Sequence, residues 1–161
     1  MIVYHGSTKE IVAPDVSYSK DNLDFGKGFY VTTIKSQAER WAARKAMRFG
    51  GEPIVNIYEL DELDGYKVKN FDDSDAEWLK FVVGCRNGGR EYEQYDVIIG
   101  KVADDDVFKC VNMFMDGYWD EDRTLEEIKY CKDNNQIVLV SKEIIDSALT
   151  FKDSYLVEEN G

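Results

Sequence analysis

Two short segments, Tyr4-His5-Gly6-Ser7 and Phe25-Gly26-Lys27-Gly28-Phe29-Tyr30-Val31-Thr32-Thr33, decide how this chain is interpreted. The first ends an apolar stretch and holds the chain's only histidine. The second carries two glycines and an aromatic residue at the end of a strand-like run. A glycine lets backbone approach a ligand closely, and an aromatic face attracts a cationic ring. Together the segments predict a site for a flat cationic ring and its attached ribose.

Hydrophobic periodicity and capping motifs outside these segments predict a chain that mixes strands with helices. Strands are expected at residues 2–5, 28–32, 54–60, 66–71, 95–102, 136–140 and 148–151. Helices are expected at residues 36–49, 74–83, 124–132 and 142–147, with one more opened by Asp104-Asp105-Asp106. Capping boxes predict three of the helix starts, at Ser36–Glu39, Ser74–Glu77 and Thr124–Glu127. Because strict βαβ alternation is missing, the pattern favours α+β. The length suits a single domain over residues 1–161.

The chain is strongly acidic, with a formal net charge of −12 and a pI of about 4.5. Such a surface repels phosphate backbones, so non-specific nucleic-acid binding is not expected. A local basic strip reads either as a solvated helix face or as a surface for a partner or a diphosphate: Lys35, Arg40, Arg44, Lys45 and Arg48. The acid-rich region from Asp116 to Glu127 reads as a solvated loop and helix start, or as a protein-docking element.

Targeting and metal signals are missing from the sequence. Without an apolar run of about 18 residues or a basic-then-apolar leader, neither a membrane span nor a signal peptide is expected. Three widely spaced cysteines form no CxxC pair, and with a single histidine they argue against a zinc site: Cys85, Cys110 and Cys131. They read as free thiols in a reducing cytosol, so we expect a cytoplasmic protein that needs no metal.

The opening segments resemble the ADP-ribosyltransferase superfamily, specifically its diphtheria-toxin-like and poly(ADP-ribose)-polymerase-like branch. That branch carries a His-Tyr-Glu triad on three strands. His5-Gly6-Ser7 matches its first motif, and Gly26-Lys27-Gly28-Phe29-Tyr30 matches its second. Residues 135–140, followed by Ile144-Ile145 and residues 149–151, resemble the third strand, with Gln136 where the Glu would stand. The likeness covers residues 2–45 and 134–151, and the combined pattern is also similar to a small uncharacterised bacterial family of this superfamily.

The resemblance implies an α+β, ADP-ribosyltransferase-like split β-sheet core with surrounding helices, and NAD as a co-substrate. His5 would hydrogen-bond a ribose hydroxyl, the Gly6 backbone would hold the carboxamide, and Ser7 would contact the same half of the ligand. Tyr30 and Trp41 would stack on nicotinamide. The implied NAD-binding residues are His5, Gly6, Ser7, Gly28, Tyr30 and Trp41, and the implied catalytic residues are His5, Tyr30 and Gln136.

Two positions depart from the family pattern. Ala38 stands where the family supplies a Ser hydroxyl to the carboxamide, so that contact is missing or comes from Ser36 or Gln37. Gln136 replaces a carboxylate that would stabilise positive charge on the sugar, and one such polar group contributes about 3–4 kcal/mol in the transition state. The departure implies single ADP-ribose transfer or no activity. A carboxylate could also come from the target or from elsewhere in the chain, as from Glu143 or Asp133.

Each of these residues also has a purely structural interpretation. His5 could be a satisfied strand-end histidine, Tyr30 and Trp41 core aromatics, and Gln136 an ordinary strand-edge residue. The leading hypothesis is an NAD-dependent mono-ADP-ribosyltransferase with an unknown protein or nucleic-acid acceptor. The family resemblance adds the hypothesis of a toxin held by an antitoxin or regulatory protein. The alternatives are a catalytically inactive NAD- or ADP-ribose-binding module and a protein-interaction domain. The RNA 2′-phosphotransferase branch is disfavoured because it relies on a second histidine that this chain lacks.

Overall fold

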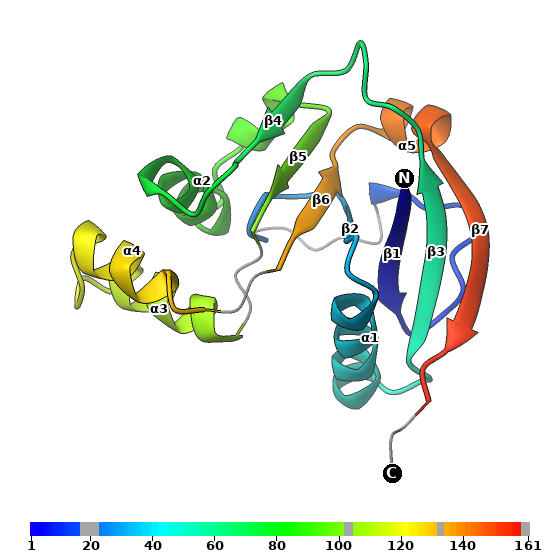
Figure 1. Ribbon diagram of the computed structural model, residues 1–161, viewed down its shortest axis with the longest axis horizontal. Helices are drawn as coiled ribbons and strands as arrows, with labels where there is room; N and C mark the ends of the chain where they lie inside the picture. Colours follow the sequence, from blue (N-terminus) through cyan, green and yellow to red (C-terminus); the bar gives the residue numbers. More distant parts are fainter. Residues whose placement is uncertain (17–22, 102–104, 132–133, 159–161) are drawn as a thin grey trace.

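The structure, a computed structural model, describes residues 1–16, 23–101, 105–131 and 134–158 (Figure 1). Its elements follow one another as β1 (Ile2–Ser7), β2 (Phe29–Val31), α1 (Lys35–Phe49), β3 (Ile54–Leu60), β4 (Val68–Asn70), α2 (Ala76–Arg86), η2 (Glu91–Gln94), β5 (Val97–Gly100), α3 (Asp105–Met115), α4 (Glu121–Ile128), β6 (Gln136–Leu139), α5 (Lys142–Ala148) and β7 (Leu149–Leu156). The α+β class expected from the sequence is confirmed.

The strands form two sheets, so the expected split of the sheet is also confirmed. One has the order β1-β3-β7 and is antiparallel; the other has the order β2-β6-β5-β4, with only the β4–β5 pair parallel. A single antiparallel bridge between Tyr4 and Thr32 joins them, because β1 and β2 run side by side where the sheets meet. The bridge therefore brings the two N-terminal motifs next to each other.

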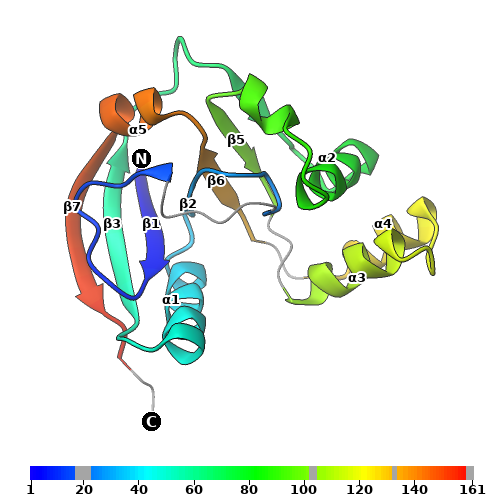
Figure 2. The same cartoon turned by 180° about the vertical axis from the view of Figure 1, so that it is seen from behind.

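Alternation along the strands divides the apolar residues between two main cores. One core fills the space between the sheets and is closed by Ile144 and Ile145 of α5, and it takes Phe29 and Val31 of β2. The other lies on the opposite face of the second sheet, beneath α2 and α3, and Tyr30 packs against it. Figure 2 shows these helices on the far side of the second sheet from β7. Neighbouring residues of β2 thus serve different cores.

A third, smaller core fixes α1 on the first sheet. Ala38 and Ala42 of the helix are fully buried against Val55 of β3, with Tyr4 of β1 packed beside them. The opposite face of the first sheet is covered by the chain after β1, since the Asn56 side chain accepts from the amide of Ile11 at 2.8 Å. Both faces around β1 are therefore closed.

The start of α1 differs from the predicted capping box. The helix begins at Lys35 with Ile34 as its N-cap, and no side chain caps it. Instead the Thr32 hydroxyl accepts from the Ile34 amide at 3.1 Å. Gln37, expected within the box, is 2 % exposed. Ser36 is exposed, because the register of the helix is set by the residues that pack on the sheet.

Two other predicted helix starts are also corrected. The second helix begins at Ala76, and its cap is Asp75 and not Ser74. The Asp75 carboxylate accepts a hydrogen bond from the Trp78 amide. The α4 helix begins at Glu121 under an Asp120 cap, so Thr124 lies inside it. Asp caps a helix as well as Ser or Thr does. The Asp75 cap of α2 follows the predicted Ser74, whereas the Asp120 cap of α4 precedes the predicted Thr124. The predicted cap at Asp104 lies outside the described residues, and β7 runs five residues past its predicted end at 151, to Leu156.

Candidate functional site

The three strands that carry the motif residues are neighbours. His5 lies on β1 and Tyr30 on β2, which the Tyr4–Thr32 bridge joins. Gln136 is the first residue of β6, which pairs antiparallel with β2. The order β1, β2, β6 therefore brings together residues from the two ends of the chain.

The His5 ring is held in a fixed orientation on the face between the sheets. It stacks on Phe29 with ring centroids 4.3 Å apart, and Nδ1 lies 2.6 Å from the Tyr30 carbonyl oxygen. A carbonyl oxygen only accepts, so Nδ1 must carry the proton and donate. Burial, with a smaller effect from Lys45, lowers the pKa of His5 to about 3. The ring is therefore neutral near pH 7, and Nε2 is a hydrogen-bond acceptor.

This lowered pKa predicts that mild acid destabilises the fold. In the unfolded chain the histidine takes up a proton below pH 6.5, whereas in the folded chain it stays neutral down to about 3. The free energy of unfolding therefore has its full value well above pH 6.5 and decreases as the pH falls through 6.5. Between about pH 7.5 and about pH 5.5 we expect a loss of about 1.4 kcal/mol in the free energy of unfolding, measured by urea denaturation. The His5→Asn variant should lose this pH dependence; an unchanged profile would contradict the prediction.

Gly6 sits under the backbone of α1. A β-carbon at this position would lie 2.7 Å from the Ala42 amide nitrogen and 3.1 Å from the Trp41 β-carbon, and closer still to the Ala38 carbonyl oxygen. The Lys45 ammonium donates to the Gly6 carbonyl at 2.7 Å. Gly6, which was expected to allow a ligand to approach, therefore also allows α1 to pack closely on β1. Trp41 of α1 lies beside Gly6.

The Tyr30 hydroxyl is tied to the glycine segment that precedes it. It donates to the Gly26 carbonyl at 2.5 Å and accepts from the Phe25 amide at 3.1 Å. Burial, followed by the nearby Asp24 carboxylate, raises the Tyr30 pKa well above its usual value, so the hydroxyl stays protonated. Gly28 passes close to β6, where a β-carbon would lie 2.9 Å from the Leu139 carbonyl oxygen. The Tyr30 hydroxyl is therefore oriented by Phe25 and Gly26, which belong to the same sequence motif as Tyr30.

Gln136 carries an unsatisfied polar group. Its side chain is 1 % exposed, and within the described part of the chain Nε2 has no hydrogen-bond partner. Since Ile137 faces the core between the sheets, alternation places Gln136 on the other face, together with Val138 and Tyr30. A buried, unpaired amide is uncommon and calls for an explanation such as a ligand or water.

The expected residues thus lie together only in part. Tyr30 and Gln136 share one face of the second sheet, whereas the His5 ring lies on the opposite face and reaches Tyr30 through its backbone carbonyl. Ser7 ends β1 and is 7 % exposed. Trp41 lies on α1, and within the described residues its ring contacts neither Tyr30 nor another aromatic ring.

Asn135, the first residue of the segment that resembles the third motif strand, organises the junction of β2, α1 and β6. Its side-chain oxygen accepts from the Thr32 hydroxyl at 2.9 Å and the Thr33 amide at 3.1 Å. Its backbone oxygen accepts from the Gln37 side chain at 2.6 Å. The position directly before a motif strand was the only available signal. Asn135 holds Gln136 in register with β2.

A buried ion pair fixes the other end of the glycine segment. Arg86 of α2 donates from Nε to Asp24 Oδ1 at 2.8 Å, and its guanidinium lies 4.2 Å from the centre of the Phe108 ring. The two side chains are 12 % and 9 % exposed. No pattern in the sequence links Asp24 with Arg86, so neither residue was predicted to be part of the site.

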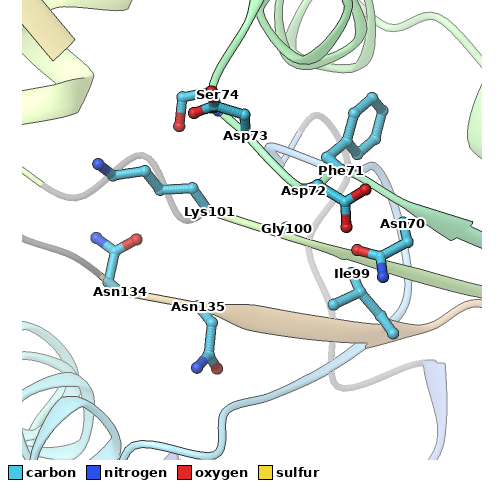
Figure 3. A pocket seen from close by; sticks show the side chains of 10 residues that line it. All are labelled: Asn70, Phe71, Asp72, Asp73, Ser74, Ile99, Gly100, Lys101, Asn134 and Asn135. Atoms are coloured by element: carbon cyan, nitrogen blue, oxygen red, sulfur yellow. Dashed lines mark hydrogen bonds between the residues drawn. The ribbon is translucent and has the colours of Figure 1, made fainter. Parts of the chain in front are cut away.

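A pocket of about 320 Å³ opens beside Asn135, at the start of β6, and its lining includes none of the expected NAD-binding residues (Figure 3). It lies at the ends of β4 and β5 and the start of β6, and its lining includes Asp72, Asp73, Lys101, Asn134 and Asn135. Carboxylates, an ammonium and amides together make a polar opening of mixed charge. It adjoins Gln136 through the preceding residue, Asn135.

Residues 1–151 match a family described as a protein of unknown function, DUF3990. The chain belongs to the DUF3990 family. No curated protein matches the sequence. The DUF3990 match spans β1, β2 and β6, so all three motif strands belong to the family domain, and it ends within β7.

The described residues of this DUF3990 chain show neither a membrane-spanning helix nor a metal-binding cluster. None of the described helices has the length and apolarity needed to cross a membrane. In residues 1–16, 23–101, 105–131 and 134–158, no group of three or more potential ligand side chains is placed to hold a metal ion. Of the alternative carboxylates, Glu143 is exposed in the first turn of α5, and Asp133 lies outside the described residues.

Proposed function

We propose that this DUF3990 chain is an NAD-dependent mono-ADP-ribosyltransferase that acts on a macromolecular acceptor, a protein or a nucleic acid. The observation that carries the proposal is the adjacency of β1, β2 and β6, which bear His5, Tyr30 and Gln136. Residues chosen from the sequence as one triad come from the two ends of the chain and yet stand on neighbouring strands. Such a coincidence is not required by the α+β class itself.

The chain's own groups suit one half of NAD. Neutral His5, with its Nδ1 proton held by the Tyr30 carbonyl, offers Nε2 as an acceptor for a ribose hydroxyl. The Gly6 carbonyl already accepts from Lys45 but retains a second lone pair for a carboxamide. On the opposite face of the second sheet from the His5 ring, the buried Gln136 Nε2 is a donor without an acceptor among the described residues. NAD would supply a nicotinamide leaving group and an ADP-ribosyl unit.

The glutamine sets the expected level of activity. A carboxylate at position 136 would stabilise positive charge that develops on the sugar, whereas an amide offers only a dipole. Loss of one such electrostatic group costs about 10²–10³ in rate. We therefore expect the wild-type chain to transfer single ADP-ribose units slowly, unless the acceptor supplies a carboxylate.

The test is nicotinamide release from NAD by the purified chain. We expect the Gln136→Glu variant to release nicotinamide about 10²-fold faster than wild type. The His5→Ala change, made in either background, should remove the release. Gln94→Glu on η2, an exposed glutamine, is the matched control and should leave the rate unchanged. Thermal unfolding of each variant shows whether it is folded. Folded Gln136→Glu protein that releases no nicotinamide would refute the proposal.

A second candidate is a catalytically inactive NAD- or ADP-ribose-binding module. It is favoured by Gln136 and by Ala38, which is fully buried against Gly6 and supplies no hydroxyl. This candidate predicts that NAD raises the melting temperature of wild type without any release of nicotinamide. If NAD gives neither stabilisation nor release, a protein-interaction domain remains.

The cellular setting belongs to the same proposal. None of the three cysteines forms a disulfide, and Cys85 and Cys110 are buried, as suits a protein kept in the reducing cytoplasm. A transferase of this kind that modifies host macromolecules would need an antitoxin or regulatory protein to hold it in check. Co-expression with its genomic neighbours, scored by growth, tests this part.

A further inference from the structure

The exposed side of α1 presents an arginine stripe, defined here as Arg40, Arg44 and Arg48. The three residues are exposed and stand four apart, so they line one face of the helix along its axis. Met47, which is 89 % exposed, and Phe49, which is 60 % exposed, lie next to the stripe at the end of the helix. Arg, Met and aromatic residues are the types enriched at protein interfaces. In a chain of net charge −12, this stripe is a local exception.

The acidic counterpart is on α4. Asp122 and Glu126 are exposed and also stand four apart on one helix face, and we call them the acidic pair. Exposed aromatic rings lie at both ends of this helix, with Tyr118 at 75 % and Tyr130 at 82 %. The two surfaces have opposite charge, the same four-residue repeat and apolar side chains at their margins.

We propose that the arginine stripe of one copy docks on the acidic pair of a second copy. The two surfaces do not meet within one chain, since α1 packs on β1 and β3, whereas α4 packs on α3 (Figure 1). In a reciprocal arrangement each copy uses both of its surfaces, and the pair closes as a two-fold dimer.

The acidic remainder of the surface explains why the contact would be selective. Elsewhere two copies repel each other, so the arginine stripe is the favourable place for an acidic element of the same chain to approach. Exposed ion pairs contribute little individually and are screened by salt. The dimer is therefore weak, and its dissociation constant rises with salt concentration.

The experiment is sedimentation velocity of the full chain over a range of concentrations at about 50 mM and about 500 mM NaCl. Wild type should associate at low salt and dissociate at high salt. Reversal of the stripe, Arg40→Glu, Arg44→Glu and Arg48→Glu together, should weaken association about tenfold or more, as should Asp122→Arg with Glu126→Arg. An equal mixture of the two reversed proteins should associate again, because the charges are then complementary in both contacts. Reversal of three exposed lysines elsewhere, Lys67, Lys80 and Lys142, controls for net charge and should leave association in place.

Three results would each overturn the proposal. Wild type that stays monomeric at low salt and high concentration would leave the arginine stripe to a different, acidic partner. Association that survives reversal of the stripe, or a mixture of the reversed proteins that fails to associate, would show that the contact lies elsewhere. The proposal does not depend on the proposed enzymatic function, since none of the reversed residues was assigned to the NAD site.

Discussion

Gly6→Ala is expected to destabilise the chain by about 3 kcal/mol or more, the upper end of the usual cost of overpacking. The added β-carbon would meet the Ala38 carbonyl oxygen and the Ala42 amide nitrogen, which are backbone atoms of α1. Trimming a facing side chain cannot relieve this contact, so the helix would have to move away from β1. Urea denaturation measures the loss in the free energy of unfolding.

Gly84→Ala is the matched control for this change. Gly84 is an exposed residue of α2, and a β-carbon there meets nothing within 4 Å. Alanine in a helix interior is favoured over glycine by up to about 1 kcal/mol, so this variant should be as stable as wild type or more stable. Equal effects at the two glycines would contradict the close packing of α1 on β1.

Arg86→Ala is expected to cost about 3–5 kcal/mol, because it removes the guanidinium that neutralises the buried Asp24 carboxylate. The pair is nearly enclosed, and the guanidinium also covers the Phe108 ring. Because Asp24 directly precedes Phe25 and Gly26, the loss should loosen the segment that holds the Tyr30 hydroxyl. Hydrogen exchange of the Gly26 and Phe29 amides would then increase before global unfolding.

The control is the exposed pair between Arg90 and Glu93. These side chains are 76 % and 45 % exposed, so Arg90→Ala should change the free energy of unfolding by no more than about 1 kcal/mol. The double variant Arg86→Ala with Asp24→Ala should recover part of the loss, since no buried charge then remains unpaired. If Arg86→Ala is as mild as Arg90→Ala, the Asp24 carboxylate is hydrated and the pair is not structural.

Local chemistry was sufficient to predict the elements and the strands that carry the motifs. Alternation in residues 54–60 gave β3 with its observed limits, and the predicted helix over 142–147 differs from α5 by one residue. Strand β2 was recognised because glycines precede a short run of bulky residues. These patterns lie within a few consecutive residues, so they can be interpreted without knowledge of the partner strands.

Helix starts and site neighbours were predicted less well, because they depend on residues distant in sequence. Gln37 fitted a capping box locally, yet the structure pairs it with Asn135 from the opposite end of the chain. Asn135 belongs to the segment that resembles the third motif strand, but no local pattern predicted its hydrogen bonds to Thr32 and Gln37. The positions of His5 and Tyr30 were predicted, but the hydrogen bond that fixes the histidine tautomer was not.

The sequence by itself determined the α+β class, the two N-terminal motifs and the acidic character of the chain, because periodicity, glycine spacing and charge are properties of the chain. Only the tertiary structure decided that β1, β2 and β6 are neighbours, that the His5 ring is neutral, and that Gln136 Nε2 is buried without a partner in the described residues. Adjacency of strands, desolvation of a ring and hydrogen-bond partners all arise when distant segments exclude water from one another. A single stretch of sequence cannot specify them.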